Sequence, residues 1–314
     1  MFKTLARGVR AARWPKVQLP ARTNEPAEGH TNPLDSTGDG ANLMKSKLAE
    51  MKSRLSTIQT HSRSSGAELE RRDKFLQMFH DNPLPSNEVL ANLGLFLNRQ
   101  LLSRILFMHE LYQLALPVHG VVMEFGTRWG QNASLFSNFR GIYEPYNYSR
   151  KVVAFDTFAG FPSVDSKDGA DPIVKDGAYG VTDDYDKFLG EVLSYHESEC
   201  PLPHITKHAL VRGDCSVTLA RYLEQHPETI VALAYFDVDL YEPTRKCLEM
   251  LMKGGHLTRG SVLGFDELNF PAFPGETVAL REAVGLDKYA IKRSPLSPTA
   301  SYLVIDRVAG PANR

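Results

Sequence analysis

The 314-residue sequence contains little cysteine and no cysteine pair at metal-binding spacing. Its three cysteines, Cys200, Cys215 and Cys247, are scattered, which excludes a disulfide scaffold and a thiolate zinc site and favours a reducing, cytoplasmic location. The formal net charge is only −1, so no overall field attracts nucleic acid or anionic lipid. No apolar run reaches the roughly 18 to 20 residues that a membrane-spanning helix needs. A charged ligand must therefore be bound by a local cluster of residues.

Composition divides the chain into three parts. Residues 1–40 begin with a basic segment and continue with Pro, Gly and polar residues, which predicts a disordered basic tail; the alternative is a targeting or membrane-surface segment. Residues 41–117 are expected to form a helical N-terminal extension that serves in dimerisation or as a lid. Residues 118–308 are expected to form the main domain.

Two apolar patterns predict helices in the extension. Apolar residues at steps of four and three between 44 and 58 form an a/d seam, which pairs with a second copy in a homo-oligomer or folds back onto the main domain. A second pattern predicts one helix over 86–116, with Ser86 as its N-cap. This helix is apolar enough to cover an edge of the core or to roof a pocket.

From residue 118, short apolar runs alternate with helical patterns, which predicts an α/β fold with a doubly wound, Rossmann-like sheet. The runs that predict buried parallel strands are 120–125, 151–156, 208–214, 230–239 and 261–267. Two alternating segments, 288–294 and 301–307, predict an antiparallel hairpin at one edge. Together they give a seven-stranded, mostly parallel sheet.

Acidic residues stand at or near the end of each of the five buried strands. They are Glu124, Asp156, Asp214, Asp237 with Asp239, and Asp266 with Glu267. Since ligands bind at the carboxyl ends of the strands in open α/β sheets, these acids are expected to meet in one crevice.

The first two strand ends predict a nucleotide-like cofactor. The loop from Gly126 to Gly130 lets the backbone approach a ligand, but it lacks the G-x-G-x-x-G spacing that a pyrophosphate needs, which disfavours a nicotinamide cofactor. Asp156 stands where a carboxylate binds a ribose. S-adenosylmethionine, which has a ribose but no phosphate, is therefore predicted. The predicted cofactor-binding residues are Glu124, Gly126, Thr127 and Gly130 near its amino-acid part, Asp156 and Thr157 near the ribose, and Asp214 and Cys215 near the adenine.

Two of these acids, Asp156 and Asp214, also have a purely structural alternative. Asp156 would then cap a helix, and Asp214 would form a turn before Ser216.

The last two strand ends predict a cation site. Carboxylates gathered there repel one another and lose water, which raises their pKa values unless a cation joins them. Oxygen ligands favour Mg²⁺, with Mn²⁺ or Ca²⁺ as alternatives. Asp237, Asp266 and Glu267 are the predicted ligands, and Asp239 then faces the substrate. The structural alternative is that Asp239 caps the next helix and that Asp266 or Glu267 pairs with an arginine such as Arg281.

Several segments of the main domain resemble the macrocin and mycinamicin type of sugar O-methyltransferases. They are EFGTRWGQN, FDTFAGFP, GD at 213–214, YFDVDLYEPT, GFDELNFPAFPGE and SYLVID, and the match covers about 118–306. The resemblance implies a class I, metal-dependent enzyme that uses S-adenosylmethionine to methylate a sugar hydroxyl in natural product or polysaccharide biosynthesis. It also implies that Asp237 and the pair at 266 and 267 bind the metal and that Asp237 and Asp239 are catalytic, with Asp239 as general base. The family pair is usually Asp-Asp, whereas this chain has Asp266 and Glu267.

Other functions stay open at this point. A metal also chelates catechols, so a catechol-type O-methyltransferase or an N-methyltransferase is an alternative, and a non-catalytic scaffold that binds the cofactor is another. The polar, Gly-rich segment 162–186 is predicted to be a lid over cofactor and acceptor rather than a disordered connection.

Overall fold

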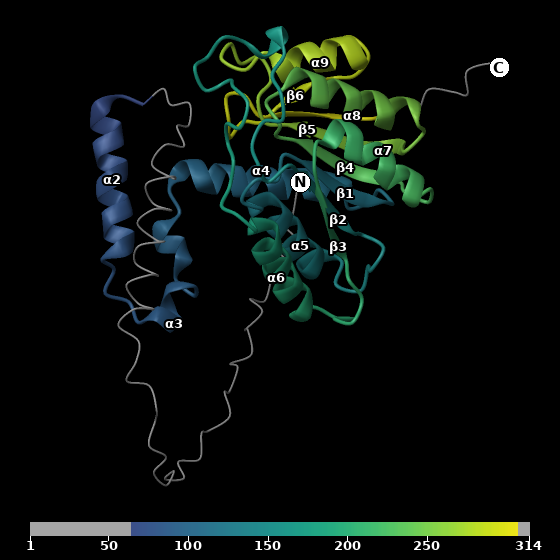
Figure 1. Ribbon diagram of the computed structural model, residues 1–314. Helices are drawn as coiled ribbons and strands as arrows, with labels where there is room; N and C mark the ends of the chain where they lie inside the picture. Colours follow the sequence, from purple (N-terminus) through teal and green to yellow (C-terminus); the bar gives the residue numbers. More distant parts are fainter. Residues whose placement is uncertain (1–63, 307–314) are drawn as a thin grey trace, which may run out of the picture. The chain divides into compact units, whose positions relative to one another are not determined.

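The computed structural model describes residues 64–306, in which helices cover both faces of one mixed sheet (Figure 1). Within these residues the sheet has seven strands in the order β3-β2-β1-β4-β5-β7-β6. The strands are β1 (Val121–Phe125), β2 (Val152–Asp156), β3 (His208–Arg212), β4 (Val231–Phe236), β5 (Leu257–Phe265), β6 (Lys292–Arg293) and β7 (Ser301–Val304). β1 to β5 are parallel, and β7 is antiparallel to both β5 and β6. The predicted Rossmann-like sheet with a C-terminal antiparallel hairpin is confirmed.

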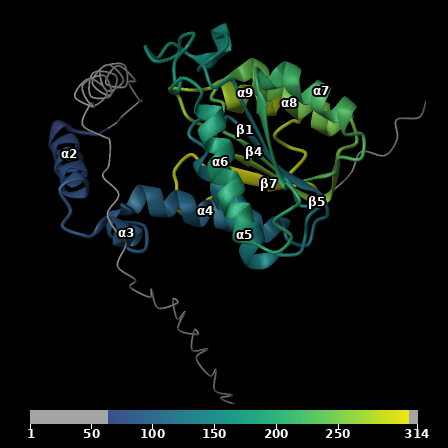
Figure 2. The same ribbon diagram turned by 60° about the horizontal axis from the view of Figure 1, so that its bottom comes forward.

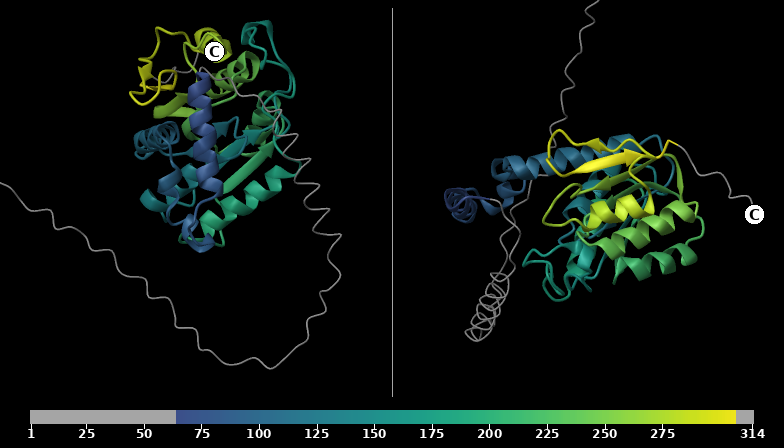
Figure 3. Two further views of the ribbon diagram at one scale, coloured as in Figure 1. Left: turned by 90° about the vertical axis from the view of Figure 1, so that its left-hand side faces the viewer. Right: turned by 90° about the horizontal axis from the view of Figure 1, so that it is seen from above.

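Two layers of helices enclose the sheet (Figure 2). One layer consists of α4 (Arg99–Ala115), α5 (Gln131–Tyr143) and α6 (Tyr185–Ser198), and the other of α7 (Cys215–Gln225), α8 (Tyr241–Lys253) and α9 (Gly275–Ala283). The last three lie side by side, α7 and α8 in green and α9 in yellow (Figure 3). Because both faces of the sheet are covered, β1 and β4 are buried along their whole length, which explains their continuous apolar runs.

A row of stacked phenylalanines crosses the sheet at the carboxyl ends of its central strands. Ring centroids lie 5.0 Å apart for Phe125 and Phe155, 4.8 Å for Phe125 and Phe236, and 5.3 Å for Phe236 and Phe265. The row packs into the core between the sheet and helices α7 to α9. The phenylalanine row therefore forms a rigid apolar layer beneath the loops that follow these strands.

The single helix predicted over 86–116 is wrong. The chain forms α3 (Ser86–Val89), the 3₁₀ helix η1 (Leu93–Phe96) and α4, because Leu97 is extended and Asn98 caps a new helix by accepting a hydrogen bond from the Leu101 amide at 2.9 Å. Ser86 is the first residue of α3 rather than its cap.

A helix that the sequence analysis did not separate, α2 (Gly66–His80), precedes this region. It begins with a capping box between Ser65 and Glu68 and has no buried residue. Phe79 packs edge-on against Phe96 with ring centroids 4.9 Å apart.

The proposed domain limits are only partly covered by the described residues. The tail at 1–40 and the a/d seam at 44–58 lie outside them, as do the last residues of the proposed 118–308 domain. The limit at 117 separates α4 from the core to which it contributes Phe107, Met108 and Leu111. Within residues 64–306, no helix is long and apolar enough to cross a membrane.

Candidate active site

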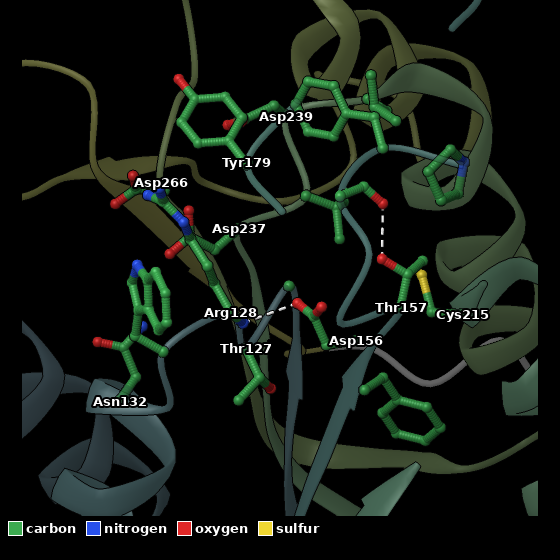
Figure 4. Close-up of a pocket in the computed structure, with 18 of the residues that line it drawn as sticks. Thr127, Arg128, Asn132, Asp156, Thr157, Tyr179, Cys215, Asp237, Asp239 and Asp266 are labelled. Carbon is green, nitrogen blue, oxygen red and sulfur yellow. Dashed lines mark hydrogen bonds between the residues drawn. The ribbon is translucent and has the colours of Figure 1, made fainter. Parts of the chain in front are cut away.

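A cavity of about 390 Å³ lies at the carboxyl ends of β1, β2, β4 and β5 (Figure 4). In the sheet, β1 lies between β2 and β4. The connection after β1 leads toward β2, whereas the connection after β4 leads toward β5 in the opposite direction, so the two loops diverge and leave a crevice. The predicted site residues in its wall are Gly126, Thr127, Asp156, Thr157, Asp214, Cys215, Asp237, Asp239, Asp266 and Glu267. The acids at the ends of β2, β3, β4 and β5 therefore share one crevice as predicted, whereas Glu124 and Gly130 do not line it.

The loop from Gly126 to Gly130 adopts left-handed backbone at both glycines, with φ of 89° and 75°. A Cβ on Gly126 would lie 1.9 Å from the carbonyl oxygen of Asp237, so this glycine lets the β1 loop pack against the loop after β4. A Cβ on Gly130 would lie 2.2 Å from Cδ1 of Leu189 in α6. Gly130 stands just before α5, behind the cavity wall.

Glu124 lies beneath this loop and is fully buried. Its Oε2 accepts a hydrogen bond from the Thr127 hydroxyl at 3.1 Å, and its Oε1 has no hydrogen-bond partner among the described residues. Burial, with a smaller contribution from Asp237, raises the pKa of Glu124 to about 8. The carboxyl group is therefore mostly protonated at neutral pH.

Asp156 joins the two loops on the cofactor side. Its carboxylate accepts a hydrogen bond from the Arg128 amide at 2.7 Å (Figure 4) and another from the Phe158 amide at 2.6 Å, and burial raises its pKa. The alternative that Asp156 caps a helix is wrong, because a turn follows β2, in which the Thr157 hydroxyl donates to the Gly160 carbonyl at 2.6 Å.

Asp214 and Cys215 lie at the start of α7. Asp214 caps this helix by accepting a hydrogen bond from the Ser216 amide at 2.8 Å, so its structural alternative is confirmed. The residue also remains part of the cavity wall, beside the buried Cys215.

Five carboxylates, which we call the acid cluster, gather on the opposite side of the site, and four of them line the cavity. They are Asp237 and Asp239 after β4, Asp266 and Glu267 after β5, and Glu276 in the first turn of α9. Burial raises the pKa of Asp237 to about 7 and, with repulsion from the other acids, raises the pKa values of Asp239 and Glu276 well above normal. Glu276, which the sequence analysis missed, is fully buried.

One of the two structural alternatives for these acids is wrong. The N-cap of α8 is Leu240 rather than Asp239, whose own backbone is left-handed with φ of 61°. Asp266 does pair with an arginine, as the other alternative expected, but this arginine is Arg104 rather than Arg281.

Arg104, on α4, is in direct contact with two carboxylates of the acid cluster. Its guanidinium forms an ion pair with Asp237, and its Nη1 lies 3.6 Å from Oδ2 of Asp266. Its Nε donates to Oδ1 of Asn132 at 3.3 Å. Asp266 also accepts a hydrogen bond from the Tyr235 hydroxyl at 2.8 Å. The sequence analysis missed Arg104, although an arginine within the apolar stretch LLSRILFM was a usable signal.

A second arginine, Arg128, points from the β1 loop toward the acid cluster (Figure 4). Its guanidinium carbon lies 4.8 Å from the ring centroid of Tyr179, and burial lowers its pKa. Tyr179 belongs to segment 162–186, which therefore forms part of the cavity wall. Asp168 anchors this segment to α8, since its carboxylate accepts a hydrogen bond from the Tyr241 amide at 2.5 Å.

The acid cluster supplies the ligand type of a divalent cation. Carboxylate oxygens are the ligands that Mg²⁺, Mn²⁺ and Ca²⁺ prefer, and Oε1 of the buried Glu276 has no hydrogen-bond partner among the described residues. In residues 64–306, however, no three acidic, histidine or cysteine side chains stand in the arrangement of a metal site. Arg104 bridges Asp237 and Asp266 in this structure.

The strand order, the antiparallel β7 and a cavity at the carboxyl edge define the class I methyltransferase fold. No protein-family model and no curated protein sequence matches the chain. Solved structures do. A crystal structure described as CalS11, calicheamicin methyltransferase, is 41% identical, with a TM-score of 0.75, over 79% of this chain and 96% of that chain.

An apo structure of CalS11, described as a TDP-rhamnose 3'-O-methyltransferase of calicheamicin biosynthesis, is 39% identical, with a TM-score of 0.68, over 77% of this chain and 96% of that chain. The chain therefore belongs to the family of S-adenosylmethionine-dependent sugar O-methyltransferases that contains CalS11. The resemblance found in the sequence is confirmed, and the protein is an O-methyltransferase rather than a non-catalytic scaffold.

Proposed function

We propose that this enzyme transfers a methyl group to a hydroxyl of a nucleotide-linked sugar or another glycosylated small molecule in natural product biosynthesis. The relative CalS11, described as acting on TDP-rhamnose, supports a nucleotide sugar as acceptor. The observation that carries the proposal is that four carboxylates of the acid cluster, those of Asp237, Asp239, Asp266 and Glu267, line the same cavity as Asp156 and the Gly126 loop. A sulfonium cofactor and a hydroxyl acceptor would thus meet in one enclosed space.

In this proposal Asp237, Asp266 and Glu267 hold a divalent cation, Mg²⁺ before Mn²⁺ or Ca²⁺. When bound, the cation would lower the pKa of the acceptor hydroxyl, and S-adenosylmethionine would supply the methyl group. Asp239 is the general base that accepts the hydroxyl proton, and Asp237 orients the acceptor beside it. The raised pKa of Asp239 makes its carboxylate a stronger base once it is ionised.

On the cofactor side, the residues that line the cavity have different roles from those behind it. Asp156 binds the ribose, because each of its oxygens keeps a lone pair beyond the bonds from the two backbone amides. Gly126 and Thr127 face the amino-acid part, and Asp214 with Cys215 faces the adenine. Glu124 and Gly130 support the β1 loop from behind the cavity wall, and Thr157 stabilises the turn after β2.

The variant Asp239→Asn tests the role of the base. Asparagine adopts left-handed backbone readily, so the loop is retained, while turnover should fall roughly 10² to 10⁴-fold. Calorimetry should show that Mn²⁺ still binds. Asp73→Asn, on exposed α2, is the control and should be fully active. Full activity of Asp239→Asn would contradict the proposed base, and loss of Mn²⁺ binding would make Asp239 a ligand instead.

The acceptor is tested by measuring S-adenosylhomocysteine formation with TDP-rhamnose, other TDP-sugars, a catechol and an amine. Turnover should be highest with a TDP-sugar and should stop in EDTA. Preference for the catechol or the amine would favour the alternative methyltransferases, and full turnover in EDTA would refute the metal requirement.

The homo-oligomer stays a prediction, because the a/d seam at 44–58 lies outside the described residues. Light scattering on the full chain measures it directly.

A further inference from the structure

Arg104 reaches the acid cluster from a helix that otherwise packs into the core. Its neighbours one turn further along α4, Phe107 and Met108, are buried against the sheet. The side chain of Arg104 keeps 33% of its surface exposed, and that of Asp237 keeps 19%, so both are open to the cavity. A long charged side chain fixed by a core helix is therefore directed at the proposed metal ligands.

Arg104 contacts one carboxylate oxygen of each of two proposed metal ligands. Asp237 Oδ2 forms the ion pair, and Asp266 Oδ2 lies 3.6 Å from Nη1. The other guanidinium near the cluster, that of Arg128, is stacked on Tyr179. Within the described residues, the ion pairs of Asp237 and Asp266 are those with Arg104.

We infer that Arg104 is an internal counter-ion that competes with the divalent cation for Asp237 and Asp266 and leaves them when the cation binds. A divalent cation and a guanidinium repel one another when both lie against the same carboxylates, and removal of Arg104 without a replacement would leave buried carboxylates uncompensated. Asn132 accepts a hydrogen bond from Nε of Arg104 and lies on the cofactor side of the cavity. The released guanidinium therefore stays within reach of Asp237 and Asp266. This inference rests on the proposed function, because it assumes the metal site.

The test is calorimetric titration of the metal-stripped full chain with Mn²⁺. Arg104→Gln removes the competitor and should bind Mn²⁺ at least about tenfold more tightly than the wild type. Arg104→Lys keeps the charge but cannot bridge two carboxylates through one planar group, so its affinity should lie between the two. The control is Arg99→Gln, an exposed position on the same helix, which should bind like the wild type.

Thermal unfolding gives a second readout. Without metal, Arg104→Gln should unfold at a lower temperature than the wild type, and Mn²⁺ should raise its midpoint by more than it raises that of the wild type. Arg104→Lys provides the same comparison in a variant that keeps the positive charge.

The outcomes separate this inference from the proposed function. If the wild type binds Mn²⁺ and Arg104→Gln binds it equally or more weakly, the competition is refuted and the metal site stands. If only the Arg104 variants bind Mn²⁺, the competition is supported and the wild-type metal requirement is refuted. If no variant binds Mn²⁺ at millimolar concentration, both fail. If Arg104→Lys binds Mn²⁺ with the same affinity as the wild type, the affinity is set by the positive charge at a distance rather than by contact of the guanidinium with the two carboxylates. This result also refutes the inference.

Discussion

The substitution Glu124→Gln should remove a pH-dependent loss of stability from the metal-free protein. The pKa of Glu124 is about 8 in the folded protein, and the ordinary value of 4.5 applies to the unfolded chain. Between these values the folded protein binds more protons than the unfolded chain, so the free energy of unfolding falls as the pH rises through this window. Glutamine has nearly the same shape, can accept the hydrogen bond from Thr127 and cannot ionise.

The size of the effect follows from the two pKa values. The full window from 4.5 to about 8 corresponds to about 5 kcal/mol, and about 3 kcal/mol of it falls between roughly pH 6 and pH 9. The other buried acids are common to both proteins, so their contributions largely cancel in the difference. The free energy of unfolding of Glu124→Gln, relative to the wild type, should therefore rise by about 3 kcal/mol over this range.

Urea denaturation in EDTA at several pH values measures this difference, with the exposed Glu70→Gln as control. The control should follow the wild-type pH dependence throughout. A difference between Glu124→Gln and the wild type that stays constant from about pH 6 to pH 9 would show that Glu124 is ionised in the folded protein across this range. Burial would then not govern its protonation, and the reasoning used for the neighbouring acids would fail with it.

Two further substitutions test the backbone and the hydrogen bonds of the site. Gly126→Ala should lower the unfolding temperature strongly, because the new Cβ would lie 1.9 Å from the Asp237 carbonyl oxygen at a left-handed φ, whereas Gly66→Ala, where nothing lies within 4 Å, should not; equal unfolding temperatures would refute this. Tyr235→Phe removes the 2.8 Å hydrogen bond to Asp266 and should cost about 1 to 3 kcal/mol in urea denaturation while weakening Mn²⁺ binding. Unchanged values in both assays would show that Asp266 does not depend on this hydroxyl.

The strands could be predicted because the burial of each strand is evident from the apolar residues of the strand itself. A strand covered on both faces, such as β4, appears as an uninterrupted apolar run that ends where the acids begin. Chain order and the right-handed connection between parallel strands then bring these ends to one edge. Asp156 and Asp237 could therefore be placed in the same crevice without coordinates.

The rest of the site depends on contacts between distant parts of the chain. Arg104 and Asp237 are 133 positions apart, and nothing in the residues around either one records the pairing. Glu276 belongs to a helix that follows the last acidic pair, and only the packing of α9 against α8 brings it into the cluster. The break between η1 and α4 was also hidden, because the apolar spacing continues through Asn98.

The charges in the cavity favour both of its proposed ligands. Arg104 forms ion pairs with Asp237 and Asp266, and Arg128 lies near the acid cluster, so these two guanidinium groups face five carboxylates. Burial and repulsion between the acids raise the pKa values of Asp239 and Glu276, which favours their protonated forms in the cation-free protein. A divalent cation and the sulfonium of S-adenosylmethionine together carry three positive charges. Each of the two would lower the cost of ionising the cluster for the other, so their binding should be cooperative and release protons, which leaves Asp239 ionised when an acceptor hydroxyl arrives.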